Sequence, residues 1–367
     1  MRILLLGEYS NVHCTLALGL RALGHSVTVL SDGDGWKNYP RDIDVARRDF
    51  SPLGSAAYWW SLRRTVRSLR GYDVVQLINP VFLPLKAERI WPLYAGLRRR
   101  NGKMFLGAYG MDYYYACAGK DCHTFRYSDF NIGPQLRTSA DISAWEREWI
   151  HGEKGRLNRY IAADCDGIIA GLYEYHAAYF PHFPDKLTFL PFPILLDPSK
   201  PFRPRTVRDG RLRLFLGEQR GRTQYKGTDI MRRALERAVS RYPERSEMVH
   251  VESVPFARYC ELMEGSQVLL DQLYSYTPGM NALEAMARGL VVVGGGEPEN
   301  YAILEETQLH PIVNVQPTEE DVYEKLCDLI THPEAIPRLS ADSRCYIERH
   351  HDYITVARRY LDFWSSK

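Results

Sequence analysis

Residues 1–30 read MRILLLGEYSNVHCTLALGLRALGHSVTVL, and this stretch decides the fold class. A short apolar run over 3–6 is followed by helical periodicity over 12–23 and by a β-branched run over 27–30. A Gly-His pair ends the expected helix. The order strand, helix, strand predicts a βαβ unit with two parallel strands.

The same alternation continues through the first half of the chain. It predicts a parallel sheet that is covered by helices on both faces. We expect further strands at 73–78, 103–106, 167–170 and 187–190, and helices at 83–99, 144–163 and 173–180.

A stretch rich in proline and arginine, 191–213, interrupts this rhythm and is the expected hinge. Beyond it the alternation restarts, so the fold class we expect is α/β, with two Rossmann-like domains that face a ligand-binding cleft. We place the domains at 1–194 and 195–351, with a final helix over 352–367 packed back on the first domain. In the second domain we expect strands at 212–216, 248–251, 268–273, 290–293 and 312–315, and helices at 227–241, 256–263, 280–288, 298–306 and from 319 onward.

The composition excludes several classes of protein. A chain of 367 residues with 45% hydrophobic and 25% charged residues is typical of a globular protein. The net charge of +2 is too small to indicate a nucleic-acid partner. No apolar run reaches the roughly 18 residues of a membrane-spanning helix, and we expect no signal peptide. Seven scattered cysteines, an odd number, indicate reduced thiols and a cytoplasmic location.

Three groups of residues resemble ligand-binding motifs only in part. Cys117, Cys122 and His123 lack a fourth ligand at a usual spacing, so we expect loop residues there and no metal or other cofactor. The loop after the first strand has one glycine where a dinucleotide fingerprint needs three. The missing glycines disfavour a nicotinamide oxidoreductase. The glycines at 294–296 precede no Lys-Ser or Lys-Thr pair, which a Walker phosphate loop needs, so a kinase and an ATPase are disfavoured as well.

The segment DQLYSYTPGMNALEAMARGLVVV, residues 271–293, is the most informative for function. A strand ends, a Pro-Gly turn opens a helix, and the first N–H groups of that helix lie near Gly279, Met280 and Asn281. Such a terminus carries the positive end of the helix dipole and suits a diphosphate. Glu284 lies one turn further, where it would accept hydrogen bonds from a ribose. The alternative is an ordinary buried helix with Glu284 as a structural acceptor.

This segment resembles the donor-binding signature of the retaining glycosyltransferases of GT-B fold, of the group 1 or family 4 type. The family has two glutamates eight positions apart, the second within E-A-M-A-x-G, and residues 284–289 match that second half. Tyr276 stands where the family has its first glutamate, near the donor sugar. The resemblance implies a donor site that includes Tyr276, Gly279, Met280, Asn281 and Glu284.

Two more segments of the second half resemble this family. LFLGEQRGRTQYKG, residues 214–227, resembles its first donor-domain strand, followed by an Arg and a Lys that clamp the diphosphate. Lys226 matches the Lys, and the Arg is either Arg220 or Arg222; the alternative is solvated surface arginines. Two cations beside a helix N-terminus would stabilise the leaving nucleoside diphosphate. Val254 lies where the family binds the nucleotide base through backbone groups.

Two loops of the first half resemble acceptor-side loops of the family. Residues 7–13, which end at His13, resemble its glycine-containing loop after strand one, with one glycine in place of a pair. Residues 107–112 resemble a loop whose polar residue faces the reacting sugar, and they include Tyr109. Asp112 is our catalytic candidate, as a group that orients or deprotonates the acceptor hydroxyl. The alternative is that Asp112 caps the turn before three tyrosines.

Basic residues are concentrated in one part of the first half. Residues 51–100 hold nine basic and two acidic side chains. Within them, 58–70 predicts an amphipathic helix with arginines at 63, 67 and 70 away from its apolar stripe. This helix is either an ordinary packed helix or a contact with an anionic membrane surface.

The resemblance implies a retaining glycosyltransferase that moves a sugar from a nucleotide-diphosphate donor to a hydroxyl of a glycan or lipid-linked acceptor, in polysaccharide biosynthesis. We expect a cytoplasmic enzyme, peripheral to the inner face of the membrane if the basic helix binds lipid. Two alternatives are a sugar-nucleotide 2-epimerase or hydrolase of GT-B fold, and a non-catalytic nucleotide- or carbohydrate-binding protein.

Overall fold

The structure is a computed structural model that describes residues 1–196, 201–207, 209–219, 221, 223–254 and 256–367. Contacts within the chain divide it into two units. Unit 1 comprises residues 1–118, 143–193 and 353–367, and unit 2 comprises residues 119–142 and 194–352. Our division along the sequence placed 119–142 with the N-terminal domain, whereas in the structure this segment groups with unit 2.

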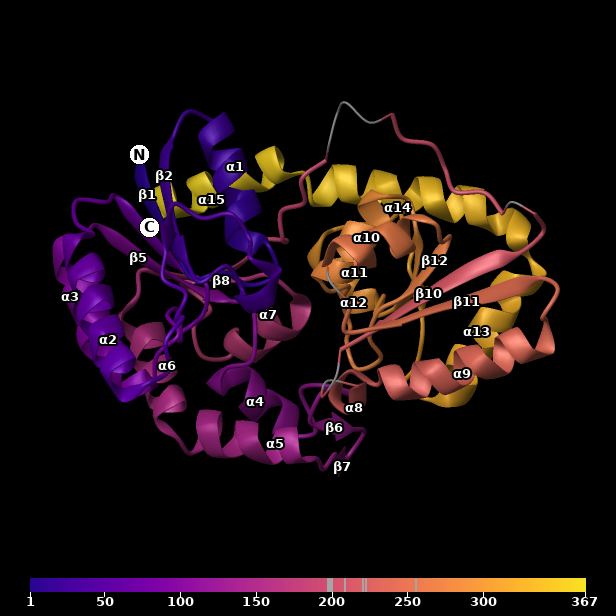
Figure 1. The fold of residues 1–367 in the computed structure, drawn as a ribbon, viewed down its shortest axis with the longest axis horizontal. Helices are drawn as coiled ribbons and strands as arrows, with labels where there is room; N and C mark the ends of the chain where they lie inside the picture. Colours follow the sequence, from indigo (N-terminus) through magenta and orange to yellow (C-terminus); the bar gives the residue numbers. More distant parts are fainter. Residues whose placement is uncertain (197–200, 208, 220, 222, 255) are drawn as a thin grey trace. The chain divides into compact units, whose positions relative to one another are not determined.

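Unit 1 contains, in the described part of the chain, a sheet of seven parallel strands in the order β3-β2-β1-β4-β5-β8-β9 (Figure 1). In the central strand β1, Ile3 pairs with Val27 of β2 and with Val74 of β4. The central strands are almost fully buried because helices cover both faces of the sheet. The strands are β1 (Arg2–Leu6), β2 (Ser26–Ser31), β3 (Ile43–Asp44), β4 (Val74–Leu77), β5 (Lys103–Ala108), β8 (Gly167–Ala170) and β9 (Leu187–Phe189).

One face of this sheet is covered by α1 (Val12–Ala22) and by the C-terminal helix α15 (Tyr353–Ser366), which lie side by side in Figure 1. The two helices approach closely at Gly19, because a Cβ there would lie 2.4 Å from the carbonyl oxygen of Tyr353. Tyr360 and Trp364 of α15 are fully buried. The hydroxyl of Tyr360 lies 2.6 Å from that of Tyr109.

Further helices of unit 1 are α2 (Pro52–Ser68), α3 (Ala87–Arg100), α6 (Glu153–Asp164) and α7 (Tyr173–Tyr179). Helix α4 (Tyr113–Lys120) and helix α5 (Ala140–Trp145) lie where the chain passes between the units. The single helix predicted over 144–163 was wrong. A π-helical turn, Glu146–Ile150, follows α5, and Gly152 in an extended conformation starts α6 as a separate helix.

Unit 2 contains, in its described residues, a sheet of five parallel strands in the order β11-β10-β12-β13-β14. In Figure 1, α9 and α13 lie on one side of this sheet and α10, α11 and α14 on the other. The strands are β10 (Leu212–Glu218), β11 (Ser246–Glu252), β12 (Val268–Leu270), β13 (Val291–Gly294) and β14 (Val313–Asn314), and the helices are α8 (Thr223–Lys226), α9 (Thr228–Arg241), α10 (Phe256–Glu264), α11 (Met280–Ala287), α12 (Pro298–Ile303), α13 (Glu319–Thr331) and α14 (Ile336–His350).

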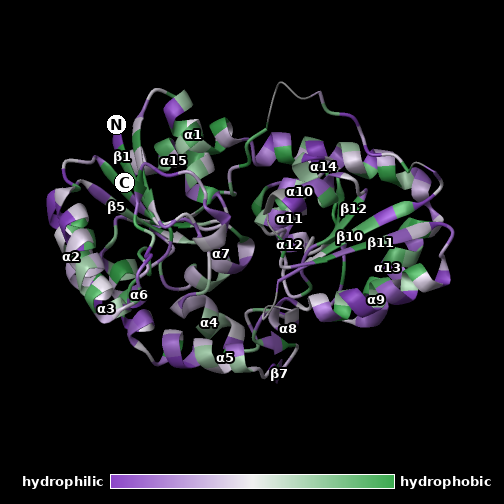
Figure 2. Cartoon of the chain, viewed as in Figure 1, coloured by the Kyte–Doolittle hydropathy of each residue, from purple (hydrophilic) through white to green (hydrophobic). Residues whose placement is uncertain are grey.

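The core of unit 2 follows from the predicted apolar runs. Leu214, Val268 and Val291 are fully buried on neighbouring strands and pack with apolar residues of α9 and α13. Both helices alternate green and purple turns in Figure 2, as expected for helices with one apolar face. Segment 119–142 adds a two-stranded antiparallel hairpin of β6 (Asn131–Ile132) and β7 (Gln135–Leu136), which the sequence did not predict.

None of the described helices is both long enough and apolar enough to cross a lipid bilayer.

Candidate donor site in unit 2

The order of the strands predicts where unit 2 binds a ligand. Strand order reverses between β10 and β12, so the loops that follow these two strands leave the sheet in opposite directions. Open α/β sheets bind ligands at the carboxyl ends of the strands at such a switch point. The connection after β10 includes the short helix α8, which ends at Lys226, and the loop after β12 leads to Gly279.

A backbone contact holds these two loops together. The carbonyl oxygen of Lys226 accepts a hydrogen bond of 2.8 Å from the N–H of Leu273. Gly227 adopts a φ of 70°, and a Cβ there would lie 2.6 Å from the Cβ of Leu273. The close approach therefore needs glycine directly after Lys226. Arg220 and Arg222, the two alternatives for the predicted arginine, lie outside the described residues.

Asp271 organises the N-terminus of α11. Its carboxylate accepts hydrogen bonds of 3.3 Å from the N–H of Gly279 and from the side-chain amide of Asn281. The hydroxyl of Tyr259 donates to the side-chain oxygen of Asn281 at 2.8 Å. Met280, the first residue of α11, is half-buried. The helix starts at the predicted residue, and the side chain of Asn281 is held by these structural contacts.

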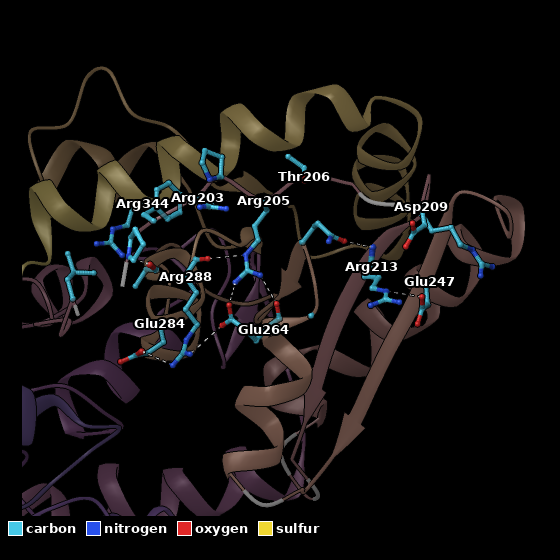
Figure 3. Close-up of a pocket in the computed structure, with 18 of the residues that line it drawn as sticks. Arg203, Arg205, Thr206, Asp209, Arg213, Glu247, Glu264, Glu284, Arg288 and Arg344 are labelled. Carbon is cyan, nitrogen blue, oxygen red and sulfur yellow. Dashed lines mark hydrogen bonds and ion pairs between the residues drawn. The ribbon is translucent and has the colours of Figure 1, made fainter. Parts of the chain in front are cut away.

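Glu284 lies one turn into α11 and is half-buried. Burial raises the pKa of its carboxyl, and the nearby Arg288 guanidinium, 3.8 Å from its Oε2 atom, opposes that shift. Its side chain lines a cavity of about 970 Å³ (Figure 3). Of the described residues predicted for the donor site, Glu284 alone lies on this cavity wall.

The cavity around Glu284 lies along a helical face of the unit. Arg205 crosses it, with hydrogen bonds to Glu264 at 2.7 Å and to the carbonyl of Arg288 at 3.1 Å (Figure 3). The far end is lined by Arg213, at the start of β10, and by Gln267, just before β12. These residues mark the amino ends of the strands, so most of this cavity does not coincide with the carboxyl edge that carries Lys226. For parallel sheets of this kind, a ligand site is expected at the carboxyl edge.

A second cavity, of about 340 Å³, lies at the carboxyl ends of β10 and β11. The buried Glu218 side chain in its wall accepts hydrogen bonds from His250 at 2.7 Å and pairs with Arg232 at 3.3 Å. The carbonyl of Glu218 also accepts a hydrogen bond of 3.0 Å from the N–H of Ser253. This bond ties the loop of Val254, which is half-buried, to the end of β10.

Tyr276 is buried beneath the inserted segment 119–142. Its hydroxyl oxygen accepts a hydrogen bond of 2.6 Å from the backbone N–H of Arg126. The Arg126 guanidinium lies 4.7 Å from the centre of the Tyr276 ring, and the Tyr127 ring lies 4.9 Å from it. At the position where the resembled family has a glutamate, this chain therefore has an aromatic side chain, which residues of segment 119–142 cover.

A buried carboxylate, Glu297, lies beside Tyr276 and holds the same segment. Its backbone N–H donates to the carbonyl of Tyr276 at 3.1 Å, and its carboxylate accepts hydrogen bonds from Tyr127 at 2.6 Å and Arg126 at 2.8 Å. Asn314 and Gln316 donate to it at 2.9 and 2.8 Å. Burial alone would raise the pKa of Glu297, but these hydrogen bonds lower it below the usual range. The sequence analysis missed Glu297, although an acidic residue directly after three glycines was a visible signal.

Arg137 connects the hairpin with the loop of Lys226. Its guanidinium donates a hydrogen bond of 2.8 Å to the carbonyl of Gln224 in α8 and lies 3.5 Å from the centre of the Tyr274 ring. It also donates to the carbonyls of Ser128 and Asp129. Segment 119–142 therefore contacts both the loop after β10 and the loop after β12.

In unit 1, Asp112 has the contacts of a buried helix cap. It is fully buried; one carboxylate oxygen accepts from the N–H of Tyr115 at 2.9 Å and the other from the hydroxyl of Tyr179 at 2.8 Å. Burial raises its pKa to about 7, although both hydrogen bonds oppose the shift. This arrangement matches the alternative set out for Asp112, and its catalytic role stays a prediction.

Of the other two residues predicted in unit 1, His13 lies in the first turn of α1 and Tyr109 directly follows β5. His13 is fully buried, with Nδ1 2.8 Å from the carbonyl oxygen of Gly7, and burial lowers its pKa to about 3. Its ring meets that of Tyr109 edge-on at 6.5 Å. The sequence analysis missed the adjacent Glu8, which is buried and accepts a hydrogen bond of 2.7 Å from the N–H of Cys14. Burial raises the pKa of Glu8 to about 8.

In the described parts of the chain, no group of three or more His, Cys, Asp or Glu residues is arranged to hold a metal ion.

Comparison with known proteins finds one protein family that part of the chain resembles. A family model described as glycosyl transferase-like matches residues 215–362. The matched stretch covers less than half of the chain. It begins in β10 and contains Lys226, the α11 N-terminus and Glu284. No curated protein matches the sequence.

Solved structures share the fold over the whole chain. HepE of Anabaena, in complex with UDP and glucose, has a TM-score of 0.60 at 11% identity, with 100% of both chains covered. Sucrose-phosphate synthase of Thermosynechococcus elongatus has a TM-score of 0.62 at 13% identity, covering 100% of this chain and 99% of that one. UDP-GlcNAc 2-epimerase of Neisseria meningitidis, bound to UDP-GlcNAc, has a TM-score of 0.55 at 12% identity, with 100% of both covered. The fold, with two Rossmann-like units, is that of the GT-B glycosyltransferases.

Proposed function

We propose that this protein is a retaining glycosyltransferase that moves a sugar from a nucleotide-diphosphate donor to the hydroxyl of a glycan or lipid-linked acceptor. The observation that carries the proposal is the hydrogen bond between Lys226 and Leu273, which lies inside the stretch that matches the glycosyl transferase-like family model. It joins the loops that follow β10 and β12 at the switch point of the sheet. The cation of Lys226 and the N-terminus of α11 thus belong to the same edge of the sheet. A diphosphate site needs both a positive charge and free N–H donors.

Each residue predicted for this edge, including Arg220 and Arg222 outside the described residues, has a role in the proposal. Lys226 neutralises the diphosphate, and the first N–H groups of α11, near Gly279, Met280 and Asn281, donate to its oxygens. Glu284, one turn into the helix, accepts hydrogen bonds from the ribose hydroxyls. Arg220 or Arg222 supplies a second cation, and the backbone near Val254 receives the base.

The proposed chemistry follows from a stabilised leaving group. The acceptor oxygen forms a bond to the anomeric carbon on the face from which the diphosphate leaves. The bond between that carbon and the phosphate oxygen breaks, and the acceptor proton passes to the leaving phosphate. Positive charge held at the diphosphate is most valuable as that bond breaks, so Lys226 acts mainly in the transition state. We propose that the reaction needs no metal ion, which predicts full activity in the presence of EDTA.

UDP-linked sugars are the first donors to test, because HepE was crystallised with UDP and glucose and the meningococcal epimerase with UDP-GlcNAc. The purified chain is incubated with UDP-glucose or UDP-GlcNAc, with and without glycan and lipid-linked acceptors. Proton NMR then follows the anomeric signals of the donor and the product. A transferase releases UDP when acceptor is present and gives a product with the donor's anomeric configuration. Conversion of UDP-GlcNAc to its 2-epimer without acceptor would support the epimerase, and a bound but unconverted donor would support a binding protein.

A further inference from the structure

The outward face of α2 carries a stripe that changes from apolar to basic along the helix. The exposed residues Leu53, Ala57, Trp60, Arg64 and Arg67 recur at spacings of three and four, so they share one face. The opposite face is anchored in unit 1, because Leu62 and Val66 are buried. The helix therefore satisfies its packing with one face and leaves an apolar second face in water.

The apolar part of this stripe is the most exposed in the described chain. Leu53 is 84% exposed, Phe50 just before the helix is 74% exposed, and Trp60 is 65% exposed; no other large hydrophobic side chain described exceeds these. All three lie within eleven residues of sequence. Single exposed hydrophobic residues are normal, but a contiguous group marks an interaction surface.

The basic part of the stripe lacks partners that would neutralise it. Arg64 and Arg67 of the stripe, and Arg70 just after the end of α2, are exposed and form no ion pair with any residue that the structure describes. Arg63 lies with its guanidinium 6.0 Å from the centre of the Trp60 ring, which places a further positive charge beside the apolar group. Arg98 on the neighbouring helix α3 is different, because it pairs with Asp166 at 2.9 Å. Arg89 and Arg99 of α3 are likewise exposed without an ion pair among the described residues, so uncompensated positive charge lies on both α2 and α3.

We propose that the outward face of α2, together with Phe50, docks on the surface of an anionic lipid bilayer. Tryptophan is favoured at the boundary between headgroups and acyl chains, and aliphatic side chains such as Leu53 insert below it. The arginines on the same face then lie at the level of anionic headgroups, which attract them. A nucleic acid would use the arginines and Trp60 but leaves Leu53 in water. The bilayer accounts for all three kinds of residue.

Co-sedimentation of the full chain with lipid vesicles tests this surface without any donor or acceptor, so its result is independent of the proposed function. The vesicles contain phosphatidylcholine, either alone or mixed with phosphatidylglycerol. The wild type should bind only the mixed vesicles, and more weakly as salt rises and screens the attraction. The double variant Arg64→Gln, Arg67→Gln should bind roughly 30-fold more weakly, since each cation near an anionic surface contributes about 1 kcal/mol.

Two further variants separate the apolar contribution from the charge. Leu53→Ser with Trp60→Ser should also weaken binding, by at least tenfold, because the inserted apolar surface is lost. The matched controls are Phe180→Ser and Arg147→Gln, which change an exposed aromatic residue and an exposed arginine elsewhere in unit 1 and should bind as the wild type does. Circular dichroism and melting temperature establish that all variants are folded, as expected for exposed positions.

Several results would overturn the proposal. One is vesicle binding that does not depend on phosphatidylglycerol or on the salt concentration. Another is equal vesicle binding by the α2 variants and the control variants. Absence of vesicle binding by the wild type would do the same. Tight binding of a single-stranded RNA that is lost in Arg64→Gln, Arg67→Gln but kept in Leu53→Ser, Trp60→Ser would assign the surface to nucleic acid instead.

Discussion

The backbone N–H of Arg126 donates a hydrogen bond of 2.6 Å to the hydroxyl oxygen of Tyr276. Residues far apart in the sequence thus meet at the position that holds a glutamate in the resembled family. The Tyr276 side chain is buried, and its ring is also covered by Tyr127. The tyrosine hydroxyl at this position fixes segment 119–142 on the rest of unit 2. We therefore expect Tyr276 to contribute to the stability of the fold and not to donor chemistry.

Tyr276→Phe should lower the free energy of unfolding by about 1–3 kcal/mol, because the N–H of Arg126 loses its acceptor. The kcat/KM for the donor should stay within a factor of about two, since the change removes no group from the diphosphate. Urea unfolding and steady-state kinetics measure the two quantities. Tyr274→Phe is the control, since the Tyr274 hydroxyl forms no hydrogen bond with the described residues; its stability should not change. A large fall in kcat/KM with unchanged stability would place the Tyr276 hydroxyl on the donor.

Arg137→Gln should raise the KM for the donor more than it lowers kcat. The variant loses the bond to the carbonyl of Gln224 and the contact with the Tyr274 ring, so the loop that carries Lys226 is less well positioned. We expect a KM roughly tenfold higher, equivalent to about 1.4 kcal/mol. Arg137→Lys, which keeps the charge above the ring, should recover part of this loss.

The matched control for Arg137 is Arg338→Gln, an exposed arginine on α14 whose partner is Asp342 at 3.0 Å. It should leave KM and kcat unchanged. The positioning role of Arg137 fails if its variant loses kcat and stability together while KM stays at the wild-type value, because that pattern reports general unfolding.

Asp112→Asn should change the pH dependence of stability. Burial raises the pKa of this carboxyl from 3.8 to about 7 in the folded chain, so between these values the folded state binds more protons than the unfolded state. Stability from this group is therefore present at low pH and is lost as pH rises through about 7. The asparagine does not titrate, so the melting temperature of the variant minus that of the wild type should increase from about pH 5 to about pH 8.

The exposed Asp185 supplies the control, since Asp185→Asn should follow the wild type at every pH. The same Asp112→Asn protein addresses catalysis. A helix cap predicts wild-type turnover with donor and acceptor. A lowered kcat with unchanged nucleotide affinity and no pH effect on stability would instead assign Asp112 to the reaction.

Local sequence patterns predicted the strands of both sheets except the short edge strand β3, and they predicted the start of α11. Uninterrupted apolar runs form the buried parallel strands, and the Pro-Gly turn directly precedes Met280. Helix α2 begins before the predicted stretch, because the Ser51 hydroxyl caps its N-terminus and a proline follows at its first position. The Ser-Pro pair is visible in the sequence as a helix start. A prediction from apolar periodicity alone does not use it.

Long-range contacts were beyond the reach of these patterns. Segment 119–142 has no strong periodicity, and the contacts of Arg126 and Arg137 with unit 2 depend on tertiary packing and not on neighbouring residues. The burial of Asp112 and Glu297 likewise depends on which elements pack above them. An aspartate in the loop of Asp112 could serve either in catalysis or as a helix cap. Only the hydrogen bonds from Tyr115 and Tyr179 in the structure show that it has the environment of a cap.

Calorimetric titration of nucleoside diphosphates tests the donor site most directly. UDP, and then GDP, ADP, CDP and dTDP, are titrated into the wild type and into Lys226→Ala, Glu284→Gln and the exposed control Lys325→Ala. At least one diphosphate should bind the wild type and Lys325→Ala equally. Its dissociation constant should rise by about 10- to 100-fold in Lys226→Ala, since a charge-assisted contact is worth about 1.5–3 kcal/mol, and should also rise in Glu284→Gln. Equal affinity in all four proteins, or no binding of any diphosphate to the folded wild type, would contradict a donor site at this edge of the sheet.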